Sequence, residues 1–239
     1  MLATMLTPAE EKAQAAVEKA VRRSYRSDAE TAMRDVLEDW CRERYPGARL
    51  FHELVMNRGT VRADVAAIQP NHLAAFEIKG PYDSSERLIH QIAMFRLAVP
   101  ELWIVTTERL MADAELVRYL LPSVGVLEVR HRDGGTGEPY SDSPWRGTVD
   151  RSALTVHVVH EPDPFAPHPE ALLSLCWVAE LRSEAIRHRV WQGKDGTHAA
   201  LLKALLKTTP AEQLSSVCRQ LRRRETLFRA DPPSREEAP

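Results

Sequence analysis

Three strand-like runs that follow one another through short connections constrain the fold of this chain more than any other feature. They are Arg49–Met56, Val61–Ile68 and Leu73–Lys79, and the links "NRG" and "QPNH" between them are rich in turn-forming residues. Links this short join antiparallel neighbours. The sequence therefore predicts a three-stranded antiparallel meander.

Helices and further strands surround this meander. Helical spacing predicts helices over residues 27–45, 84–99 and 111–122, and apolar runs predict strands over 101–107, 124–130 and 153–160. Ser27 with Glu30, and Asp83 with Glu86, have the spacing of N-terminal helix caps. The order α-β-β-β-α-β-α-β predicts a mixed α/β sheet, with the last strand pairing at the edge with 124–130.

The rest of the chain has a different character. A helix is expected within residues 1–26 and a loop over 133–150. The core, expected over 27–160, is followed by a proline-rich linker over 161–169 and a basic helical domain over 170–229. That domain is expected to hold helices over 170–190, 198–208 and 210–228, the last opened by Thr209-Pro210 and Glu212. Residues 230–239 are expected to be disordered.

Composition places the chain among globular proteins of a reducing compartment. It is 44% hydrophobic and 28% charged, and it has no apolar stretch as long as a membrane span. Its cysteines, Cys41, Cys176 and Cys218, are far apart and form no C-x-x-C pair, which argues against a disulfide framework or a zinc ribbon. With no signal peptide evident at the first residues, we expect a cytoplasmic protein.

Charged residues interrupt the predicted strands. Asp64 stands within "VRADVAAI", and Glu77 and Lys79 stand within "LAAFEIKG". Because strand side chains alternate between faces, Glu77 and Lys79 share a side, and a short hairpin can bring Asp64 beside Glu77. Glu53 can join them from the preceding strand.

Carboxylates that close together repel one another unless a cation lies between them. A set of oxygen ligands suits Mg²⁺ or Mn²⁺ better than zinc. A hard divalent ion beside a lysine can lower the pKa of a bound water and stabilise charge on a phosphate. We therefore expect a hydrolytic metal centre, although an E-x-K in a strand is also common on a solvent-facing surface.

The ordered set "RADVAAI…AAFEIKG" resembles the PD-(D/E)XK nuclease superfamily, in a bacterial branch with no characterised function. The resemblance covers about residues 27–107 and implies a restriction-endonuclease-like core of the α-β-β-β-α-β kind. It implies that Asp64, Glu77 and the main-chain carbonyl of Ile78 bind the metal and that Lys79 is the catalytic lysine. Glu53 would be a further ligand or a water-orienting group, with Glu38 on the opening helix as its rival.

Many members of that superfamily carry Gln and, four residues later, Tyr in the helix after the lysine. Here Gln91 and Phe95 have that spacing, one helical turn apart. Gln91 is expected to orient the lysine or a phosphate, whereas Phe95 lacks the hydroxyl and is expected in the core. His157 and His160 fall on opposite faces of a strand, so with His168 they are interpreted as structural.

Together these features predict a Mg²⁺-dependent (deoxyribo)nuclease. Residues 171–229 hold 11 Lys and Arg against 5 Asp and Glu, a net of +6 in a chain of net −2. Such a segment is typical either of a phosphate-binding surface or of solvated helices in a capping or dimerising bundle. The arginines expected to contact DNA are Arg182, Arg187, Arg189, Arg222, Arg223 and Arg224. A homodimer is possible. The alternative is a catalytically silent module that binds DNA or protein inside a larger assembly.

Overall fold

The computed structural model describes residues 28–56, 60–132, 145, 149–163, 165–225 and 230–233. The helix expected within 1–26, most of the loop expected over 133–150, and residues 234–239 lie outside these ranges. Residues 28–44 are helical and form what is here called the opening helix. In the described parts, no helix is long and apolar enough to cross a membrane.

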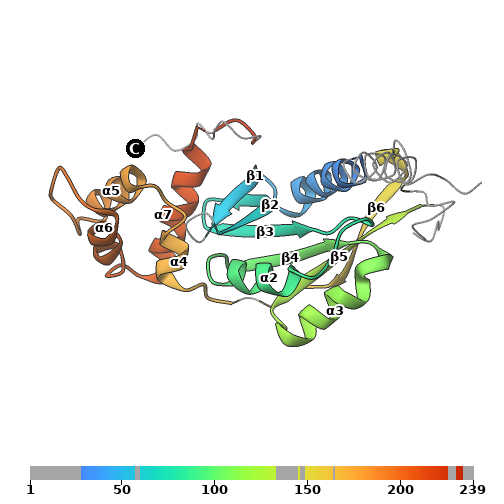
Figure 1. Ribbon diagram of the computed structural model, residues 1–239. Coiled ribbons are helices and arrows are strands. Elements are labelled where there is room, and N and C mark those ends of the chain that lie inside the picture. The colour runs from blue at the N-terminus through green and yellow to red at the C-terminus, as the bar shows by residue number, and fades with distance from the viewer. Residues whose placement is uncertain are drawn as a thin grey trace, which may run out of the picture.

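A single six-stranded sheet forms the centre of the molecule (Figure 1). Its strands, in spatial and chain order, are β1 (Arg49–Met56), β2 (Val61–Gln69), β3 (His72–Ile78), β4 (Glu101–Thr106), β5 (Val124–His131) and β6 (Leu154–His160). The pairs β1–β2, β2–β3 and β5–β6 are antiparallel, whereas β3–β4 and β4–β5 are parallel. The predicted meander and the edge position of the last strand are thus confirmed, within a mixed α/β fold.

Helices cover both faces of the sheet. The first parallel crossover passes through α2 (Leu88–Arg96) and the second through α3 (Met111–Leu120), and both helices pack on one face. The opening helix packs on the other face (Figure 1). Its Met33 and Leu37 belong to one buried cluster with side chains of β2, β3 and β4.

Trp103 fills the centre of that second face and is fully buried. Gly125 of β5 lies against its ring, because a Cβ on Gly125 would come within 2.5 Å of the indole. Glycine is required here for close approach and not for an unusual backbone angle.

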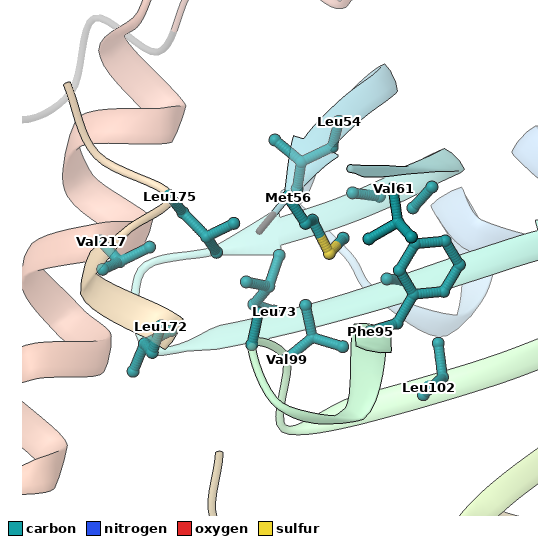
Figure 2. Packing of buried hydrophobic residues seen from close by; sticks show 14 of the residues in the cluster. Leu54, Met56, Val61, Leu73, Phe95, Val99, Leu102, Leu172, Leu175 and Val217 are labelled. Atoms are coloured by element: carbon teal, nitrogen blue, oxygen red, sulfur yellow. The ribbon is translucent and has the colours of Figure 1, made fainter. Parts of the chain in front are cut away.

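The C-terminal helices are α4 (Pro169–Leu173), α5 (Val178–Arg187), α6 (His198–Leu205) and α7 (Pro210–Arg223). They lie at the end of the sheet where β2 connects to β3 (Figure 1), and their apolar residues share one continuous core with the α2 face. Figure 2 shows Leu172, Leu175 and Val217 from this region beside Leu73 of β3. The described residues of this region therefore share apolar packing with the sheet.

Several local expectations are wrong. Helix α2 begins at Leu88, later than expected, and Asp83 does not cap it. The Asp83 carboxylate instead accepts a hydrogen bond from the Gly80 N–H at 2.7 Å and closes a turn. The helix expected over 170–190 is two helices, since the Glu180 carboxylate accepts from the Trp177 N–H at 2.6 Å and starts a new helix there. Helix α7 begins at the predicted cap but ends at Arg223.

Residues 230–233 lie along the outer edge of β1. The Asp231 N–H donates to the Leu50 carbonyl at 2.9 Å, and the Leu50 N–H donates back to the Asp231 carboxylate at 3.0 Å. Arg49 adds bonds to the Asp231 and Leu221 carbonyls at 2.8 and 2.7 Å. This segment thus satisfies backbone groups on the outer edge of β1, which an unpaired edge strand would leave open.

Candidate functional site

The site forms where β2 and β3 stop pairing. Their ladder runs from Gln69–His72 to Val65–Phe76 and goes no further. Beyond it, the Ile78 N–H has no strand partner and donates instead to the Asp64 carboxylate at 2.7 Å. Asp64 therefore stands in an apolar run because its side chain replaces a missing backbone acceptor.

Glu77, Lys79 and Gln91 form the second part of the site. Glu77 lies on the same side of β3 as Leu73 and Ala75, which is the side covered by α2. The Lys79 ammonium donates to Glu77 Oε1 at 2.8 Å and to Gln91 Oε1 at 3.0 Å. These bonds fix the ammonium beside the carboxylate, although only 3% of the Glu77 side chain and 12% of the Lys79 side chain are exposed.

Both carboxyl groups have raised pKa values. Burial, followed by the negative charge of Glu77, raises the pKa of Asp64 to about 7, against the opposing effect of the Ile78 N–H and Arg34. Burial also raises the pKa of Glu77, opposed chiefly by the Lys79 ammonium. The free energy of the ionised form of each acid is therefore raised by its surroundings, as is common at functional sites.

These groups open onto a cleft with a volume of about 530 Å³. All the side chains singled out by the sequence as catalytic or metal-binding line it, and so does Ile78; the side chains are Glu53, Asp64, Glu77, Lys79 and Gln91. Phe95, one turn beyond Gln91, is instead fully buried in the core, as expected.

Glu53 reaches the cleft through an unusual backbone conformation. Its φ of 57° lies in the left-handed region, which a non-glycine residue adopts at a cost in energy. This conformation interrupts the alternation of side chains along β1, so that Phe51 and Leu54 both point to the α2 face. The Glu53 carboxylate forms an ion pair with Arg62.

The opening helix supplies two residues that sequence reasoning missed, Glu30 and Arg34. Glu30 lines the cleft, and Arg34 donates to the Asp64 carbonyl at 2.7 Å and to Glu30 at 2.9 Å. The rival acid, Glu38, lies two turns further on, 3.3 Å from His52, and does not line the cleft. A Glu–Arg pair at i, i+4 beside a buried apolar stripe was the only signal in the sequence.

Oxygen atoms around Asp64 and Glu77 suit a hard cation. Glu77 Oε2 is buried and makes no hydrogen bond to any described residue, and the carboxylate and carbonyl oxygens here are the ligands that Mg²⁺ and Mn²⁺ prefer. Over the described ranges, however, no three His, Cys, Asp or Glu side chains form a group ready to hold a metal. Any ion held here would therefore use these two carboxylates with main-chain oxygen or water.

The basic helices lie away from the cleft. Cys218 of α7 contacts the His72 carbonyl at the start of β3, whereas Glu77 and Lys79 stand at its end. Arg222 is only 6% exposed, and Arg224 binds the Glu180 carboxylate at 2.5 and 2.7 Å. Arg222 is therefore buried, and the Arg224 guanidinium is paired with a carboxylate of the same group of helices.

Arg187 and Arg189 are exposed, as are parts of Arg182 and Arg223. His157 contacts Thr155 at 2.9 Å and His160 contacts Glu115 at 2.7 Å, so these histidines have separate partners, consistent with structural roles.

Comparison with known proteins gives one finding. A family model described as Bacteriophage P4 protein cII matches residues 23–136. The matched region runs from before the opening helix past β5 and contains every cleft residue named above. No curated protein and no solved structure matches the chain.

Proposed function

We propose that the chain is a metal-dependent nuclease that hydrolyses DNA phosphodiester bonds. The observation that carries this proposal is the half-buried Asp64 carboxylate and the buried Glu77 carboxylate at an open cleft, with the Lys79 ammonium bound to Glu77. A meander with an acid on β2 and Glu-x-Lys at the end of β3, followed by α2 and the parallel strand β4, supports a restriction-endonuclease-like arrangement.

In this proposal, Asp64, Glu77 and the Ile78 carbonyl would hold Mg²⁺ or Mn²⁺. Such an ion supplies Lewis-acid chemistry and lowers the pKa of a bound water. Ile78 fits this role, because in an extended strand the N–H and C=O of one residue point to the same side, and the Ile78 N–H points at Asp64.

Lys79 would place a positive charge where negative charge develops on the phosphate. Its ammonium is restrained by Glu77 on one side and by Gln91 on the other, so little reorganisation is needed during the reaction. Glu53 would orient water at the edge of the cleft.

A nucleic-acid substrate agrees with the cations around the cleft. Arg62 and Arg87 line it together with Lys79, and the side chains of Arg62 and Arg87 are exposed. Positive groups at the rim of an acidic centre can hold the phosphates that flank a scissile bond. Exposed Arg187 and Arg189 would provide at most a distant contact.

The test is cleavage of supercoiled plasmid DNA with Mg²⁺ or Mn²⁺. The Asp64→Asn and Lys79→Met variants remove a charge each, and we expect both to lose at least about a hundredfold in rate. Exposed Asp163→Asn and Lys194→Met make the same chemical changes away from the cleft and should cleave like the wild type. Equal activity in all five proteins would refute the assignment.

A second function is favoured by one observation, the Arg34 guanidinium beside Asp64. A resident cation would allow the acids to persist in a module that binds DNA or protein without cutting. Calorimetric titration with Mg²⁺ separates the two functions, because only the nuclease should show binding that Asp64→Asn abolishes.

A further inference from the structure

Three carboxylates from three different elements surround one nitrogen atom of Arg34. Its Nη2 lies 2.9 Å from Glu30 Oε1 on the opening helix, 3.8 Å from Glu53 Oε1 on β1, and 3.7 Å from Asp64 Oδ1 on β2. This convergence is not the helix pair Glu30–Arg34 alone, since two of the acids belong to the sheet.

The guanidinium is fixed in this position. Its other terminal nitrogen, Nη1, donates to the Asp64 main-chain carbonyl at 2.7 Å, and the Arg34 side chain is only 11% exposed. An arginine keeps its charge at every pH a protein tolerates. Arg34 therefore provides a permanent positive charge among acids that would otherwise repel one another.

Arg34 and Lys79 lie on opposite faces of the sheet. The opening helix, which carries Arg34, covers one face, whereas Glu77 and Lys79 lie on the face covered by α2. Asp64 lies between them at the split of the two strands. Asp64 thus lies beside two groups of charges: Glu30 and Glu53 around the Arg34 guanidinium, and Glu77 with the Lys79 ammonium.

We infer that Arg34 occupies the position that a second divalent ion would otherwise take, so that the site binds a single ion, on the Glu77 side. Two-ion phosphodiesterases use paired metals to balance a cluster of carboxylates. Here a protein side chain balances Glu30, Glu53 and Asp64, whereas Glu77 Oε2 is buried without a hydrogen bond to any described residue. The inference rests on the proposed function, because it concerns the ion of that same site.

The inference predicts what happens when the charge of Arg34 is removed. Arg34→Gln keeps an amide that can donate to the Asp64 carbonyl, but it leaves the three acids without a cation. They should then accept a second divalent ion. Arg34→Lys keeps the charge and should not.

Counting bound Mn²⁺ tests this directly, through the loss of the free-ion signal in electron paramagnetic resonance. We expect one ion per chain for the wild type and for Arg34→Lys, and two for Arg34→Gln. Arg42→Gln is the matched control, since Arg42 lies on the same helix, pairs with Glu38 and Asp39 and does not line the cleft. It should bind one ion.

Two ions on the wild type would overturn the inference without any variant, even if Arg34→Gln failed to fold. A folded Arg34→Gln that binds one ion would also overturn it. Both results leave the nuclease proposal intact, provided that Asp64→Asn abolishes the binding. A wild type that binds no Mn²⁺ would refute the proposed function and this inference together.

Discussion

Asp64→Asn should stabilise the protein at alkaline pH in the absence of divalent ions. Burial and the charge of Glu77 raise the pKa of Asp64 from an ordinary 3.8 to about 7. Between those two values the folded protein holds a proton that the unfolded chain has released. The free energy of unfolding of the wild type therefore falls as pH rises through this window, and the contribution of Asp64 is lost above pH 7.

The magnitude follows from the size of the shift. Roughly three pKa units at about 1.4 kcal/mol each correspond to about 4 kcal/mol. Asparagine carries no charge, and its carbonyl oxygen can still accept from the Ile78 N–H, which the Asp64 carboxylate holds at 2.7 Å. We therefore expect the variant to match the wild type near pH 4 and to exceed it by about 3–4 kcal/mol near pH 8.

Urea denaturation in EDTA buffers at several pH values measures this difference. The exposed Asp163→Asn change provides the control and should give a small difference that is independent of pH. If the difference in free energy of unfolding between Asp64→Asn and the wild type does not grow between pH 4 and pH 8, the pKa of Asp64 is not raised in the folded protein.

Three further predictions concern the ion, the core and the C-terminal helices. At pH 8, Mg²⁺ at tenfold above its Kd should stabilise the wild type by about 1.4 kcal/mol in thermal melts and leave Asp64→Asn unchanged; equal shifts would contradict the ligand assignment. Gly125→Ala should lower the free energy of unfolding by about 1–3 kcal/mol, because the new Cβ meets an indole ring at 2.5 Å. Gly80→Ala, where the nearest contact is 3.5 Å, is its control in the same urea titration. Arg224→Ala should lower the free energy of unfolding measured in urea by about 3–5 kcal/mol, because it leaves the buried Glu180 carboxylate without its cationic partner. The Mg²⁺ affinity measured by calorimetry should stay unchanged.

Much of the sheet could be predicted from the sequence because its determinants are local. Alternating apolar residues and short connections define β1, β2 and β3 without reference to the rest of the chain. The same alternation places Glu77 and Lys79 on one side of β3. A short hairpin then leaves Asp64 few positions other than beside them.

The parts that could not be predicted depend on packing between distant segments. Glu30 lines the cleft and Glu38 does not, because only the helical turn that carries Glu30 faces the split strands. Helical periodicity alone places both residues on the same face of the helix. Residues 230–233 become ordered only because the edge of β1 offers backbone groups to Asp231. Their composition alone is typical of disorder.

The split between β2 and β3 joins folding and chemistry in one carboxylate. Once the ladder ends at Val65–Phe76, the Ile78 N–H needs an acceptor, and a buried donor left unpaired costs about 1–3 kcal/mol. Asp64 supplies that acceptor with one oxygen and faces the Arg34 guanidinium with the other. Replacing Asp64 by alanine would remove both functions at once, so any loss of cleavage could reflect a loosened strand end. Asparagine keeps the bond to Ile78 and removes the charge alone. A cleavage defect in Asp64→Asn that accompanies higher stability at pH 8 would therefore assign the charge to the chemistry and the bond to the fold.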